Sequence, residues 1–110
     1  MARKALSGIG FETLQQIAAG GAAAAGVAVR CPRDGGTVQA TVSGTGAVSA
    51  TVAIEGSNDG TNWLTLGTIT LSGTTSATDG FAFSAPWVYI RSNCTAISGT
   101  GAALSVVMGA

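Results

Sequence analysis

The stretch Ile54-Glu55-Gly56-Ser57-Asn58-Asp59-Gly60-Thr61-Asn62-Trp63 joins two β-type runs through a turn and indicates the fold class. Its Asp59-Gly60 pair is suited to the positive backbone angles of a tight hairpin, and the Ser and Asn side chains around that pair can hydrogen-bond to the loop backbone. Trp63 then places a large aromatic side chain at the start of the second run. The stretch predicts a β-hairpin of a sandwich and carries no catalytic signature.

The runs on both sides of this stretch alternate apolar and polar residues with a period of two, as half-buried antiparallel strands do. We expect the runs 37–42, 48–54 and 63–71 to form a three-stranded meander, with turns at 43–46 and 57–62 and a bulge at Gly67. A turn at 72–76, a short strand at Phe81 and Phe83, a strand over 87–96, a turn at 98–101 and a strand over 103–108 follow. Turns about every ten residues predict an all-β fold, an antiparallel β-sandwich of jelly-roll or Ig-like type.

The amino-terminal part is less regular than the rest. Phe11, Leu14 and Ile17 lie at helical spacing, but the glycines on both sides would confine a helix to about two turns, which is marginal without tertiary support. We therefore favour an extended arm that leads to a strand over 12–18, with another strand over 27–31 ended by Pro32. The chain length of 110 residues suits one core. The predicted organisation is an arm and first strand over 1–20 and a β-sandwich domain over 21–110.

Charge is scarce in this chain. Only 9% of the residues are charged, against about 25% in typical domains, and the formal net charge is zero. The exterior must then consist mainly of Thr, Ser, Gly and Ala, which suits a surface that neighbouring subunits cover. We expect a subunit of an assembly and a homo-oligomer.

The few charges are unevenly distributed. Residues 1–34 hold four cations and two carboxylates, a balance of +2, and residues 35–110 hold one cation and three carboxylates, a balance of −2. A basic arm with Arg3 and Lys4 could dock on an acidic neighbour, or these charges could simply be solvated. Neither interpretation gives the dense basic patch of a nucleic-acid-binding protein.

The sequence shows no targeting or membrane pattern that we can identify. Polar and glycine residues interrupt the segment after the basic start, so we expect no signal peptide, and the apolar run 18–29 is too short to span a bilayer. The two cysteines, Cys31 and Cys94, could form a bridge across the sandwich. Without a secretion signal we favour two reduced cysteines that serve as small apolar residues.

Groups that carry chemistry are few. The chain has no histidine, which removes the commonest general base and the serine-histidine and cysteine-histidine systems. Of the five carboxylates, Asp59 and Asp79 lie in turn-like contexts beside glycines, and the Asp59 segment lacks the spaced acidic positions of a calcium loop. A hydrolase would need two carboxylates from distant strands to converge. We expect no catalytic residue, no metal site and no cofactor, and therefore no enzyme.

Three aromatic residues, Trp63, Trp87 and Tyr89, are open to two interpretations. Trp87 and Tyr89 lie two positions apart, so on a strand they would face the same side. They could form an exposed sugar platform, but in a chain with so few large residues we favour burial for both tryptophans. Trp and Tyr are also enriched at the centres of protein interfaces. The candidate interface residues are therefore Arg3, Lys4, Phe11, Trp87 and Tyr89.

Taken together, 52–63, 64–71 and the segment Ala85-Pro86-Trp87-Val88-Tyr89-Ile90-Arg91 resemble a pattern found in small structural proteins of tailed bacteriophages. The resemblance covers about residues 37–108. The hairpin also resembles that of discoidin-type jelly rolls, where it is a fold element more than a binding site.

The phage resemblance implies a virion protein, assembled in the host cytoplasm. Its most specific form is a capsid decoration or cement protein that binds the major capsid protein, or another virion protein, over capsomer junctions. The alternative is a tail, baseplate or fibre-associated module that binds host-surface glycans. The resemblance does not extend to the amino-terminal region, so the mode of attachment stays open.

Overall fold

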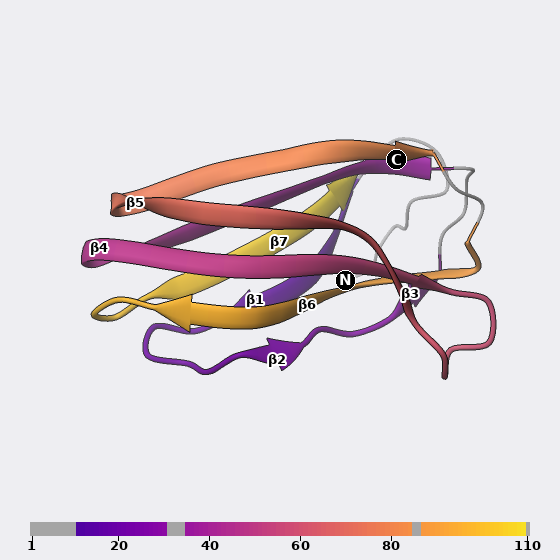
Figure 1. Ribbon diagram of the computed structural model, residues 1–110, viewed down its shortest axis with the longest axis horizontal. Coiled ribbons are helices and arrows are strands. Elements are labelled where there is room, and N and C mark those ends of the chain that lie inside the picture. Colours follow the sequence, from indigo (N-terminus) through magenta and orange to yellow (C-terminus); the bar gives the residue numbers. More distant parts are fainter. Residues whose placement is uncertain (1–10, 31–34, 85–86, 110) are drawn as a thin grey trace.

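The structure, a computed structural model, describes residues 11–30, 35–84 and 87–109, and all regular elements in these ranges are strands (Figure 1). The expected all-β, antiparallel class is confirmed. The described part contains no helix with the length and apolar character required to cross a membrane. In chain order the strands are β1 Phe11–Ile17, β2 Ala24–Ala25, β3 Val29–Arg30, β4 Gly35–Ser57, β5 Leu64–Ser84, β6 Tyr89–Ser98 and β7 Ala103–Gly109.

The long strands β4 and β5 form one hairpin that folds over on itself. Their register passes from Ser43 opposite Ser76 to Ala47 opposite Thr74, and at this point both ribbons reverse direction (Figure 1, left). The first half of β4 pairs with β7, which pairs with β1, whereas its second half pairs with β6, which pairs with β2 and β3. The folded sheet is therefore a sandwich of two antiparallel layers.

The two bends coincide with the turns expected at 43–46 and 72–76, but the expected meander is wrong. Residues 37–43 pair with β7 and with the second half of β5, not with 48–54. Both strands of the hairpin bend at the same place. Each half of β4 therefore stays paired with a half of β5, and the two paired halves lie in different layers. Positive φ angles of 137° at Gly46 and 76° at Thr75 make the reversal, and the N–H of Thr45 donates to the Thr100 carbonyl at 3.0 Å.

The core lies between the two layers and follows the alternation of the sequence. A bulge lies beside Gly67, one residue from the expected position: Ile54 pairs with Gly67 and Glu55 with Thr65, which leaves Leu66 as the extra residue. Gly67 also gives room to a ring from the other layer, since a Cβ there would lie 2.6 Å from Cζ of Phe81. The most deeply buried apolar side chains of the strands are Leu14, Val38, Ala40, Val42, Val48, Ala50, Val52, Ile54, Ile69, Leu71, Ile90, Cys94, Leu104, Val106 and Met108.

The amino-terminal part forms strands, as we favoured, and no helix within the described residues. β1 occupies nearly the range expected and pairs with β7 at an edge of the sheet. Of the strand expected over 27–31, the described residues show Val29–Arg30 as a strand, residue 31 lies outside them, and β2 was not predicted. The turn expected at 98–101 is present, with the N–H of Ala102 donating to the Gly99 carbonyl at 3.2 Å. The arm before Phe11 lies outside the described residues.

Candidate interface region

The loop 58–63 closes the β4–β5 hairpin and is organised by one carboxylate. Oδ1 of Asp59 accepts from the N–H groups of Thr61 and Asn62, each at 2.8 Å, and Oδ2 accepts from the Asn62 side-chain amide at 2.8 Å. Oγ of Ser57 accepts from the N–H groups of Asp59 and Gly60 at 3.2 and 2.9 Å. The turn role predicted for Asp59 is confirmed, although positive φ is confined to Gly60, at 75°.

The same hydrogen bonds fix the charge of the loop. They hold the pKa of Asp59 well below its usual range, first through the N–H of Asn62, then that of Thr61, then the side chains of Asn62 and Ser57. Asp59 is therefore ionised at neutral pH, and both its oxygens are engaged within the loop. Among the described residues, no group of three or more His, Cys, Asp or Glu side chains is placed to hold a metal ion.

Beside this loop lies an ionic and aromatic cluster that sequence reasoning missed, made of Glu55, Trp63, Arg91 and Asn93. Nε of Arg91 lies 2.7 Å from Oε1 of Glu55, and the Asn93 amide donates to Oε2 at 3.3 Å. The Arg91 guanidinium carbon lies 4.2 Å from the centroid of the Trp63 ring. The cluster exists because β4 and β6 pair with Glu55 opposite Arg91, a register that the sequence does not show.

Within this cluster the polar groups satisfy one another. The side chains of Arg91 and Glu55 are 26% and 12% exposed, so water screens their attraction only in part. Arg91 covers a face of the Trp63 ring, which is the surface that a sugar ring would stack on. The cluster therefore links β4 and β6 rather than forming an open binding site.

Trp87 and Tyr89 lie at the same end of the sandwich, and both are half-buried, but they do not share a face. Trp87 packs against the core, and a Cβ added at Gly56 would lie 2.7 Å from its Cγ. The Tyr89 ring lies beside Gly60 of the loop. The expected common face is wrong because β6 begins at Tyr89, so strand alternation does not include Trp87.

The other candidate interface residues are distributed differently. Arg3 and Lys4 lie outside the described residues. Phe11 is the first residue of β1 and pairs with Gly109 of β7. The structure thus brings Trp87 and Tyr89 to the loop end and places Phe11 on an edge strand. The interface role of all five residues stays a prediction.

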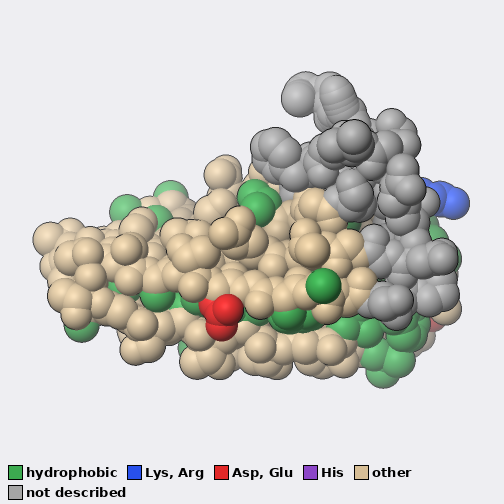
Figure 2. All heavy atoms as spheres, turned by 90° about the horizontal axis from the view of Figure 1, so that it is seen from above, with side chains coloured by type: hydrophobic (Ala, Val, Ile, Leu, Met, Phe, Trp, Pro, Cys, Tyr) green, Lys and Arg blue, Asp and Glu red, His purple; other side chains and the backbone are tan. Residues whose placement is uncertain are grey.

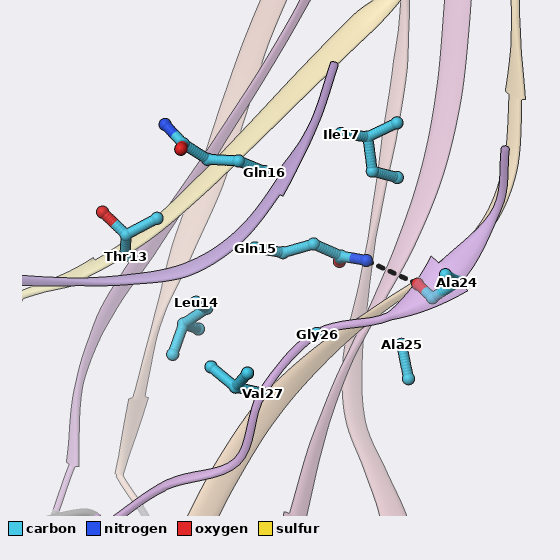
Figure 3. Close-up of a pocket in the computed structure, with 9 residues that line it drawn as sticks. All are labelled: Thr13, Leu14, Gln15, Gln16, Ile17, Ala24, Ala25, Gly26 and Val27. Atoms are coloured by element: carbon cyan, nitrogen blue, oxygen red, sulfur yellow. Dashed lines mark hydrogen bonds between the residues drawn. The ribbon is translucent and has the colours of Figure 1, made fainter. Parts of the chain in front are cut away.

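A groove of about 360 Å³ runs between β1 and the segment 24–27 (Figure 3). Gln15 crosses it: its side-chain amide donates to the Ala24 carbonyl, and its Oε1 accepts from Oγ of Ser92 at 2.7 Å. Leu14 lies buried at its base, and Val27 at its rim is 66% exposed. The residues that line the groove include no ionisable side chain, so Gln15 acts as a link between β1, β2 and β6.

Cys94 is a buried free thiol, 1% exposed, that donates to the Ala96 carbonyl at 3.3 Å. Burial raises its pKa, so the thiol stays protonated at neutral pH. It serves as a small apolar core residue, as we favoured for both cysteines. Cys31 lies outside the described residues.

The outer faces of the four long strands are nearly free of charge. Strands β4 to β7 contain three charged residues, Glu55, Asp79 and Arg91, and two of them pair with each other. Figure 2 looks onto the flank formed by β5, where an acidic group (red) lies amid backbone and uncharged side chains. The strands thus present hydroxyl groups, small side chains and backbone to their surroundings.

Comparison with solved structures places this fold among phage-derived proteins. It is similar to the PBSX exported protein XepA, with a TM-score of 0.55 and 18% identity over 99% of this chain and 39% of that one. The SPBc2 prophage-derived protein YomS gives a TM-score of 0.57 at 8% identity over the full length of both chains. The K1 cleaved adhesin domain of Lys-gingipain from Porphyromonas gingivalis W83 gives 0.49 at 13% identity, over 96% of this chain and 78% of that one.

No protein-family model matches the chain, and no curated protein matches it in sequence. The likeness to XepA and YomS is at identities that establish a common fold and nothing finer. The chain therefore shares its fold with XepA and with the prophage-derived protein YomS, which agrees with the resemblance to phage proteins found in its sequence.

Proposed function

We propose that this chain is a non-enzymatic structural protein of a phage particle, a decoration or cement protein that binds the major capsid protein over capsomer junctions. The observation that carries the proposal is the exterior of the sandwich. Over β4 to β7, Glu55 and Arg91 neutralise each other, which leaves Asp79 as the one charged residue outside an ion pair.

Such an exterior is suited to permanent coverage by protein. Burying an unpaired charge costs several kcal/mol, on the order of the stability of a whole contact, whereas hydroxyl groups and small side chains desolvate at less cost. A flat contact that is weak in one copy becomes strong when many copies bind a closed shell. The fold that the chain shares with XepA and YomS supports a phage origin.

The glycan-binding alternative finds less support in the aromatic residues. A sugar platform needs an open ring face, but Arg91 covers a face of Trp63, and Trp87 packs over Gly56. Tyr89 is half-buried beside the loop. The experiment must therefore be able to detect a tail or fibre role with glycan recognition.

The test is co-sedimentation of the purified protein with capsids that lack it, beside tail fractions and a glycan array. We expect saturable binding to shells and greater resistance of the shells to heat. Binding only to tails or glycans, or to none of these, would overturn the cement role.

Two lysine variants, each on the outer face of one layer, locate the contact. Thr37 is exposed on the β7 side, and Thr51 is half-buried on the β6 side. A lysine in the contact would add a charge that binding must bury, so one of Thr37→Lys and Thr51→Lys should lose shell binding while the other retains it. Full binding by both variants would show that neither face forms the contact.

A further inference from the structure

The first half of β5, residues 64–73, is an edge of the layer that also contains β4, β6, β2 and β3. Among the described residues, β5 has β4 as its only strand neighbour. In Figure 1 the second half of β5, in orange, forms the upper margin of the molecule, and the redder first half lies below it. A strand in this position presents unpaired backbone N–H and C=O groups along its free side.

Edge strands are usually protected against pairing by charges, prolines or bulges, and the two halves of β5 differ in this respect. In the second half Asp79 lies opposite the buried Ala40, which places a carboxylate on the core-facing side of the edge. The first half contains no charged residue and no proline. Its bulge lies at Leu66, near one end, and leaves 68–73 as a regular unprotected strand.

The opposite flank of the sandwich is closed by the chain itself. After β1, the chain crosses toward β6, where the N–H of Gly26 donates to the Ser92 carbonyl at 2.8 Å and Gln15 binds the Ala24 carbonyl. The strands on that flank are poorly suited to pairing with an added strand, because β2 and β3 have two residues each and β1 changes register between Thr13 and Gln15. The regular edge available for strand addition is therefore 68–73.

We propose that a second copy of this chain pairs with this edge, antiparallel, with Thr70 on the two-fold axis. In that register Ile69 lies opposite Leu71 of the second copy, and Thr68 lies opposite Ser72 of the second copy. Hydroxyl groups then meet hydroxyl groups on the outer side, where Thr68, Thr70 and Ser72 are exposed, while Ile69 and Leu71 on the core side stay buried in their own copy. Cross-strand pairs of hydroxyl residues are favourable.

The symmetry of the edge agrees with a dimer. Each copy uses the same segment, so the contact is isologous and closes at two copies. Residues 64–73 contain no charged side chain, so the paired segments themselves do not repel each other, and the charged residue of β5 is Asp79 in its second half.

Charge reversal at residue 70 tests the pairing, since the two-fold axis places this residue opposite itself. The molar mass of the full chain is measured by light scattering and sedimentation from about 1 to 300 μM for the parent, Thr70→Lys, Thr70→Glu and their mixture. Thr37→Lys is the control, because Thr37 is also an exposed strand threonine but pairs on both sides. Far-UV circular dichroism and the melting temperature establish that each variant is folded.

We expect the parent and Thr37→Lys to dimerise, and each residue-70 variant to raise the dimer Kd roughly tenfold or more. The mixture should restore the dimer, because lysine would then face glutamate. A monomeric parent over the whole range would overturn the proposal, and so would a dimer that Thr70→Lys and Thr70→Glu leave intact. This inference is independent of the cement role. Shell binding of the folded residue-70 variants can be measured separately, even if the parent does not dimerise.

Discussion

Replacing Gly56 with alanine should destabilise the protein because of a single ring. A Cβ at this position would lie 2.7, 2.9 and 3.0 Å from Cγ, Cδ1 and Cδ2 of Trp87, closer than carbon atoms approach in proteins. The contact is with the rigid base of the indole, so the whole side chain must move. Overpacking of this kind costs about 1–3 kcal/mol, which in a domain of this size lowers the melting temperature by about 4 °C or more.

The same replacement should be harmless once Trp87 is absent. In a Trp87→Ala background the space above Gly56 is open, and alanine in a strand is favoured over glycine by about 0.5–1 kcal/mol. The double-mutant cycle should therefore give a coupling free energy of about 2 kcal/mol. Urea unfolding followed by far-UV circular dichroism measures all four proteins, and an equal cost of Gly56→Ala in both backgrounds would refute the contact.

Three further predictions concern the loop, the cluster and the core. Arg91→Met should lower the free energy of unfolding by about 1 kcal/mol, through loss of the ion pair and of the contact with Trp63, and should change the Trp63 fluorescence. The lowered pKa of Asp59 adds stability that is complete above the ordinary carboxyl pKa of about 3.9 and is lost as the pH falls toward the lowered value. Melting temperatures from pH 7 to pH 2 should thus fall less in Asp59→Asn than in the parent. Cys94 should resist thiol-labelling reagents in the native protein and react after unfolding, as measured by mass spectrometry of its peptide.

The fold class could be predicted because it depends on local features. Alternation over 37–42, 48–54 and 63–71 reports which side chains face a core, and the Asp59-Gly60 turn, the bulge beside Gly67 and the turn at 98–101 have local chemistry. The same signals placed the chain reversals at 43–46 and 72–76. They did not show that these two reversals coincide in space and carry one hairpin from one layer to the other.

The arrangement of the loop end could not be predicted, because it depends on strand pairing over long separations. Glu55 meets Arg91 only in the register that β4 and β6 adopt, and a shift by one residue would place these side chains on opposite faces. The orientation of Trp87 depends on where β6 begins, a boundary that pattern alone locates only to within a few residues.

The doubled-over β4–β5 hairpin has a consequence for how the chain folds. Each of these strands contributes to both layers, so neither layer can assemble or dissolve while the other stays intact. Because these pairings join residues far apart in sequence, we expect slow folding and unfolding in a single cooperative step.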